Sequence, residues 1–72
     1  MNYGRSVAVL KQAAIYRAAG MDDRNCALLT AGKYLPDDQA EIYDFILYHF
    51  ATVERIARKI PLVVDGITRK EF

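Results

Sequence analysis

The sequence predicts an all-α domain with two short helices, one long helix, and a short C-terminal β-hairpin or extended tail. Three segments repeat apolar residues at helical spacing, and each is bounded by a capping residue, a glycine or a proline. The chain has 72 residues, so we expect one domain over residues 1–72. A domain of this length is marginally stable alone, and a partner chain is a common remedy.

The first helix is expected over about residues 6–19. Ser6 is suited to the N-cap because its hydroxyl accepts a hydrogen bond from a free backbone N–H of the first turn. Apolar residues recur at helical spacing from Val7 to Ala14, and several alanines raise the helix propensity. Gly20 supplies the left-handed residue that commonly follows a helix end.

The second helix is expected over about residues 23–31. Asp22 or Asp23 serves as its N-cap, because a carboxylate is favoured at the partial positive charge of a helix N-terminus. Gly32 marks its end. Cys26 and Leu29 are expected to point inward, with Leu28 as a further inward candidate.

The third helix is expected over about residues 36–59, roughly 36 Å at about 1.5 Å per residue. Pro36 suits the first helical position, where a backbone N–H would have no intrahelical partner. Acidic residues follow from Asp37, basic residues lead up to Lys59, and this order complements the helix dipole. Pro61 prevents the helix from continuing.

The middle of this long helix is apolar nearly all round, so it must be buried nearly all round. Two short helices offer too little surface to cover it, whereas a second copy of the long helix would. We therefore expect a homodimer with antiparallel long helices, in which acidic starts meet basic ends. The expected dimer interface is Ile42, Phe45, Ile46, His49, Phe50, Val53 and Ile56. The expected core is Val7, Leu10, Ala14, Leu29, Ile42, Phe45, Ile46, Phe50, Val53 and Ile56.

The tail over residues 61–72 changes character. Residues 62–64 include two β-branched valines, Asp65-Gly66 is typical of a type I′ turn, and residues 67–69 follow as a second strand. Because an isolated hairpin is marginal in water, this segment is either a hairpin packed on the helices or a tail that docks on a partner.

Composition excludes several classes of protein. The single cysteine forbids an internal disulfide and favours a reducing cytoplasm. The single histidine and the lack of a Cys or His cluster predict no metal site. No apolar run approaches the roughly 18–20 residues of a membrane span. The net charge of +1 gives no global attraction to nucleic acid.

Candidate chemistry is sparse. His49 and Cys26 have no second catalytic group assigned, so we interpret both as core or interface residues. Asp37, Asp38 and Glu41 follow a helix-starting proline and are typical helix-start residues. No phosphate-binding or zinc-binding motif is present in the sequence. We therefore expect no catalytic residue, no cofactor and no enzymatic activity.

One segment offers an alternative. Residues 11–30 resemble the helix-turn-helix family, with Gly20 and Met21 at the turn, which would imply a DNA-binding transcriptional regulator. Asp22 and Asp23 would then open the recognition helix and face the phosphates, which disfavours nucleic acid.

The function that we expect is a small adaptor-like regulator or inhibitor, of bacterial or phage origin, that binds a larger protein. Tyrosine is favoured at interfaces because it buries a large area with little entropy loss, and basic residues line the outer face of the first helix. The candidate partner-binding residues are Tyr34, Tyr43, Leu47, Tyr48, Arg5, Lys11 and Arg17. A structural subunit of a larger assembly is a further alternative.

Overall fold

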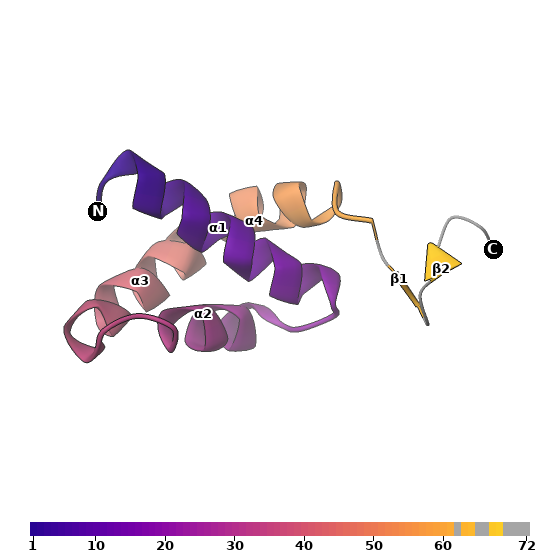
Figure 1. Ribbon diagram of the computed structural model, residues 1–72. Helices are drawn as coiled ribbons and strands as arrows, with labels where there is room; N and C mark the ends of the chain where they lie inside the picture. Colours follow the sequence, from indigo (N-terminus) through magenta and orange to yellow (C-terminus); the bar gives the residue numbers. More distant parts are fainter. Residues whose placement is uncertain (62, 65–66, 69–72) are drawn as a thin grey trace.

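A computed structural model describes residues 1–61, 63–64 and 67–68. The described part of the chain forms four helices, which confirms the all-α class (Figure 1). They are α1 (Tyr3–Ala18), α2 (Asp23–Ala31), α3 (Pro36–Tyr48) and α4 (Phe50–Ala57). Two-residue strands β1 (Val63–Val64) and β2 (Ile67–Thr68) pair antiparallel, with Val63 opposite Thr68. The expected turn at Asp65-Gly66 lies outside the described residues.

Helix α1 begins earlier than expected. Asn2 is its N-cap, and the Asn2 Oδ1 atom accepts a hydrogen bond of 2.7 Å from the backbone N–H of Arg5. Ser6 lies inside the first turn, where its hydroxyl donates to the Asn2 carbonyl at 2.9 Å. The prediction of Ser6 as N-cap was therefore wrong, because Asn2, a residue that caps as well as serine, holds the N-cap position one turn upstream.

The turn after α1 is a Schellman motif. The Met21 N–H donates to the Tyr16 carbonyl at 3.2 Å, and the Gly20 N–H donates to the Arg17 carbonyl at 2.9 Å. Gly20 has a φ of 102°, a conformation that costs other residues a steric penalty. The predicted role of Gly20 is confirmed.

Helix α2 has the predicted bounds. Asp22 is its N-cap, and the Asp22 Oδ1 atom accepts a 2.8 Å hydrogen bond from the Asn25 N–H. Helix α3 begins at Pro36, as predicted, with Asp37 and Asp38 in its first turn.

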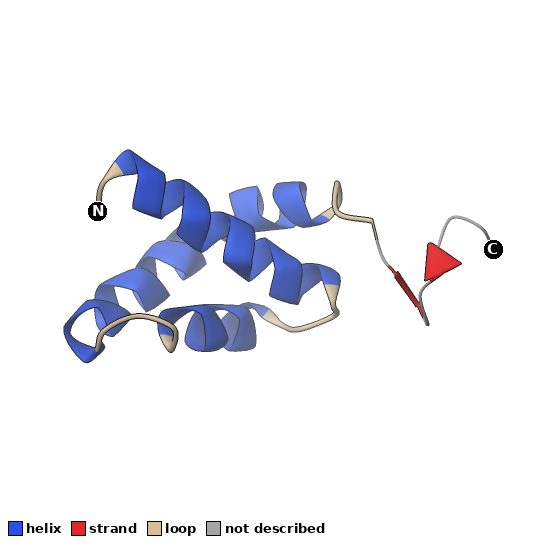
Figure 2. Ribbon diagram, viewed as in Figure 1, coloured by secondary structure: helices blue, strands red, loops and turns tan. Residues whose placement is uncertain are grey.

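The prediction of one continuous helix over residues 36–59 was wrong. Helix α3 ends at Tyr48, α4 begins at Phe50, and His49 between them has φ −104° and ψ 26°. Helix α3 packs mainly against α2, whereas α4 packs against α1 (Figure 2). No proline or glycine lies at the break. Because the two halves pack on different neighbours, we attribute the break to tertiary packing.

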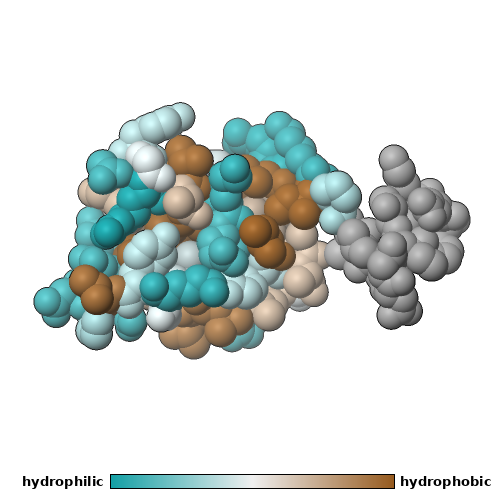
Figure 3. Space-filling model, viewed as in Figure 1, coloured by the Kyte–Doolittle hydropathy of each residue, from teal (hydrophilic) through white to brown (hydrophobic). Residues whose placement is uncertain are grey.

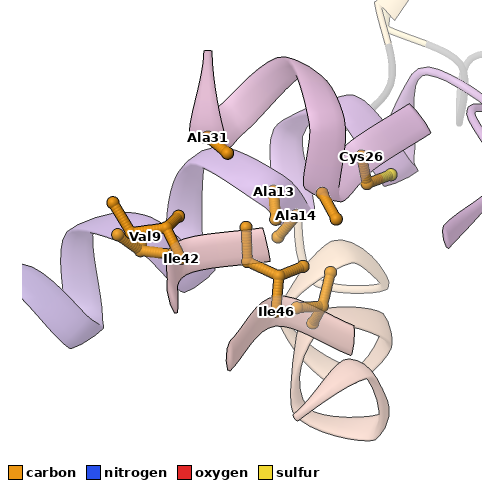
Figure 4. Packing of buried hydrophobic residues seen from close by; sticks show 9 residues of the cluster. Val9, Ala13, Ala14, Cys26, Ala31, Ile42 and Ile46 are labelled. Carbon is orange, nitrogen blue, oxygen red and sulfur yellow. The ribbon is translucent and has the colours of Figure 1, made fainter. Parts of the chain in front are cut away.

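The core draws on all four helices, and most of its residues are small (Figure 4). Its fully buried members are Val9, Ala13, Ala14, Cys26, Ala27, Ala31, Ile42, Ile46 and Val53. Alanines on α1 and α2 let these helices approach the isoleucines of α3 closely, which explains how a short chain covers them.

The core prediction was partly right. Ala14, Ile42, Ile46 and Val53 are buried, and the predicted Leu10, Phe45, Phe50 and Ile56 are half-buried against them. Val7 and Leu29 were wrongly placed inside, since their side chains are 37% and 43% exposed. No helix among the described residues is long and apolar enough to cross a membrane.

Candidate interaction surface

Three leucines are exposed on and just after α2. Leu28 is 60% exposed, Leu29 is 43% exposed, and Leu35, in the loop before α3, is 72% exposed. Figure 3 shows hydrophobic atoms gathered over α2, along the lower edge of the molecule. We call these residues the leucine face, together with exposed Asn25 of α2 and exposed Gly32 at its C-cap.

The leucines point outward because α2 packs through its small residues. Cys26, Ala27, Thr30 and Ala31 are buried, and they occupy the opposite side of the helix. A leucine in their place would hold α2 away from α1 and α3. The row of small residues in the sequence indicates which side of α2 is buried. The prediction that Leu29 points inward did not take this row into account.

The leucine face has the spacing of a helix–helix contact. Asn25, Leu28, Leu29 and Gly32 follow the i, i+3, i+4, i+7 pattern, which places them on one side of α2. Gly32 has no side chain, so the backbone at the end of the helix is open to a close approach. On this side of α2, Leu28 and Leu29 therefore form a ridge, with Asn25 before it and the open space at Gly32 after it.

A second exposed row lies on α3. Asp37, Glu41, Asp44 and Tyr48 follow one another on its outer side, and Tyr48 is 85% exposed. The Glu41 carboxylate lies 3.7 Å from the N-terminal amine of Met1. Three tyrosines were predicted to contact a partner, and Tyr48 is the one whose side chain is exposed to solvent.

The other predicted apolar contacts are less accessible. Tyr34, Tyr43 and Leu47 are half-buried and pack against the core. The Tyr34 ring also lies 5.4 Å below the Arg5 guanidinium. Most of the surface of these three side chains is therefore buried within the chain, and little of it is exposed to a partner.

Two of the three predicted basic contacts have partners within the chain. The Arg5 guanidinium lies 3.3 Å from the Asp38 carboxylate. The Arg17 guanidinium lies 3.5 Å from the Glu54 carboxylate and donates to the Met21 carbonyl. Lys11 is exposed.

The residues predicted for a dimer interface do not form one surface. Ile42, Ile46 and Val53 are at most 1% exposed in the core of the single chain, so their side chains have no area to offer a second copy. Phe45, His49, Phe50 and Ile56 are half-buried. Because the chain bends at His49, α3 packs on α2 and α4 packs on α1, so these residues are covered within one chain.

The two candidate reactive residues have ordinary structural settings. His49 is half-buried with its ring 4.5 Å from that of Phe45 and 5.0 Å from that of Tyr48. Burial raises the pKa of the Cys26 thiol, and Asp22 and Asp23 raise it further against the opposing effect of nearby Arg17. A thiol held protonated is a poor nucleophile.

Other ligand sites are weakly developed in the described part of the chain. A hollow of about 280 Å³ is lined by Arg17, Ala18, Glu54, Ala57 and Arg58, and the Arg17 and Glu54 side chains in this lining pair with each other. No group of three potential metal ligands occurs among residues 1–61, 63–64 and 67–68.

The α1–turn–α2 unit has the glycine turn of a helix-turn-helix motif, but its second helix lacks the matching surface. Asp22 and Asp23 stand exposed at the start of α2, and Leu28 and Leu29 occupy its outer side. A helix that enters a DNA groove presents basic and polar groups there. Comparisons with protein-family models, curated proteins and solved structures gave no match.

Proposed function

We propose that this chain acts by protein–protein interaction, as a small regulator or inhibitor without catalytic activity of its own, and that the leucine face is its contact surface. The observation that carries the proposal is the exposure of Leu28, Leu29 and Leu35 together on and beside one short helix. Fully burying a leucine side chain contributes about 1.5–3 kcal/mol relative to leaving it exposed. Covering the parts of these three side chains that are still exposed contributes a fraction of this value for each leucine and favours association.

The chemistry of the surface favours a protein over a nucleic acid. Leucines give no complementarity to phosphates, and the acidic start of α2 repels them. A protein contact, by contrast, typically combines an apolar centre with a polar rim. Leu28 and Leu29 supply the centre, with Asp22 and Lys33 at its two ends.

The buried thiol agrees with an intracellular setting for this activity. Cys26 is free and buried, and unpaired cysteines are typical of reducing compartments. The proposed location is therefore the cytoplasm.

Site-specific photo-cross-linking tests the proposal in cells of the source organism. A photoreactive amino acid replaces Leu28 in one variant and Ile15 in another; Ile15 is 51% exposed on α1 and is the matched control. We expect a discrete protein adduct from position 28 that disappears when Leu29→Glu is added, and a weaker adduct or none from position 15. Equal labelling at both positions would contradict the proposal.

A further inference from the structure

We propose that the leucine face binds a second copy of this chain, with the two α2 helices antiparallel around a two-fold axis between Leu28 and Leu29. The inference rests on the proposed function, since it takes the leucine face to be a contact surface. Two features of α2 favour a second copy as the partner at this face: the symmetry of its outer side and the charges at its ends.

The outer side of α2 is nearly symmetric about its two leucines. Asn25 lies three residues before Leu28, and Gly32 lies three residues after Leu29. In an antiparallel pair, Asn25 of each copy lies opposite Gly32 of the other, so an amide side chain fills the space that the glycine leaves. In a parallel pair, two asparagines would meet at one end and two glycines would leave a gap at the other. The shape therefore fits the antiparallel arrangement.

The charges favour the same arrangement. Asp22 stands at the N-terminus of α2 and Lys33 just beyond its C-terminus, both exposed. At about 100° per residue, Asp22 and Lys33 lie about 20° apart around the helix axis. Both are therefore on the same flank of the leucine face. An antiparallel pair brings Asp22 of each copy towards Lys33 of the other, whereas a parallel pair would bring like charges together.

The cap of α2 is compatible with this contact. The Asp22 Oδ1 atom is engaged by the Asn25 N–H, which leaves the second carboxylate oxygen for a lysine. Antiparallel helices also place the positive end of one dipole beside the negative end of the other.

The size of the contact sets the expected affinity. Helix α2 has nine residues, and a contact along a helix of this length falls below the roughly 1,200 Å² of a stable interface. We therefore expect a weak dimer, with a Kd on the order of tens of micromolar.

Cysteine cross-linking tests the arrangement directly. The variants are Asn25→Cys and Gly32→Cys, each oxidised alone and as a mixture, with the two chains distinguished by mass. The unmodified chain is the control for Cys26, which is fully buried. We expect a disulfide-linked heterodimer in the mixture, because positions 25 and 32 lie opposite each other.

The single variants decide the orientation. In the antiparallel pair the two copies of position 25 lie about 10 Å apart along the helix, beyond the roughly 7 Å that a disulfide spans. A cross-linked dimer of Asn25→Cys alone, at the yield of the mixture, would overturn the antiparallel arrangement. No cross-link in any sample at a concentration of several hundred micromolar would overturn self-association at this face.

A charge variant supplies a second readout in the intact chain. Lys33→Glu places two carboxylates together at each end and should weaken the dimer about tenfold by sedimentation. Asp22→Asn, which retains a capping side chain, should recover most of that loss when combined with it. An unchanged Kd in the Lys33→Glu variant would contradict the proposed end contacts.

Failure of this inference is distinguishable from failure of the proposed function. Without a cysteine cross-link, a photo-adduct from position 28 to a different protein leaves the leucine face as a contact surface and removes the second copy as its occupant. Absence of both products removes the proposed function as well.

Discussion

The imidazole ring of His49 lies 4.5 Å from the ring of Phe45, at the residue where α3 ends and the chain bends towards α4. The two rings are tilted by 55°, and the ring of Tyr48 packs edge-on against His49. These contacts stabilise the bend, which in turn allows α3 to pack on α2 and α4 on α1.

Replacing His49 with alanine should therefore lower the free energy of unfolding by at least about 0.5–1.5 kcal/mol, which is the contribution of a ring pair in addition to the area that it buries. Urea unfolding followed by circular dichroism measures this loss. A double-mutant cycle with Phe45→Leu supplies the control, because the His49 substitution should cost less once the Phe45 ring is absent. Equal losses in both backgrounds would mean that the ring contact does not stabilise the bend.

The burial pattern predicts that truncation of two large apolar residues, Ile46 and Leu28, lowers stability by different amounts. Ile46 is fully buried, so Ile46→Ala should cost about 2–5 kcal/mol through lost burial and the cavity left behind. Leu28→Ala, at a site 60% exposed, should change stability by about 0.5 kcal/mol or less. Thermal unfolding at a concentration well below the expected Kd measures both, and similar losses would contradict the outward orientation of Leu28.

The N-cap of α2 predicts how two variants of Asp22 differ in stability. Asp22→Ala removes the acceptor of the Asn25 N–H and should destabilise the protein by about 1 kcal/mol. Asp22→Asn retains an acceptor and should have little effect. If denaturant midpoints show both variants to be equally stable, the hydrogen bond of the cap does not contribute.

The buried thiol predicts a loss of stability at alkaline pH. Burial raises the pKa of Cys26 above its ordinary value. Below that ordinary value the thiol is protonated in both states, whereas above it the unfolded chain loses the proton first and unfolding becomes more favourable. Stability should therefore fall as pH rises from 7 to 10.

The Cys26→Ala variant is the control for the other groups that titrate in this range. Its free energy of unfolding should fall less steeply with pH than that of the unmodified chain. Identical slopes would show that Cys26 has the same pKa in both states.

Local signals predicted some boundaries of the fold. The roles of Gly20 and Pro36 were predicted correctly, and the N-cap of α2 is one of the two candidates, Asp22 or Asp23, because each of these signals depends on the chemistry of one or two residues. The bend at His49 was not predicted, since neither proline nor glycine lies there. It arises from packing between helices that are distant in sequence.

The candidate surface was missed for a related reason. Large apolar residues such as Leu29 were assumed to point inward, whereas the close packing of α2 depends on Ala27 and Ala31. The expected interface on the long helix assumed that Ile42 and Ile46 needed a second copy to cover them. The bend lets α1 and α2 cover them within one chain.

The most direct test of the leucine face is a series of ¹H–¹⁵N correlation spectra of the intact chain between about 10 µM and 1 mM, a range chosen to bracket the expected Kd. We expect concentration-dependent shifts at the amides of Asn25, Leu28, Leu29 and Lys33, which disappear in the Leu28→Glu variant. Shifts centred instead on Tyr43, Leu47 and Phe50, or spectra unchanged over the whole range, would contradict self-association through α2.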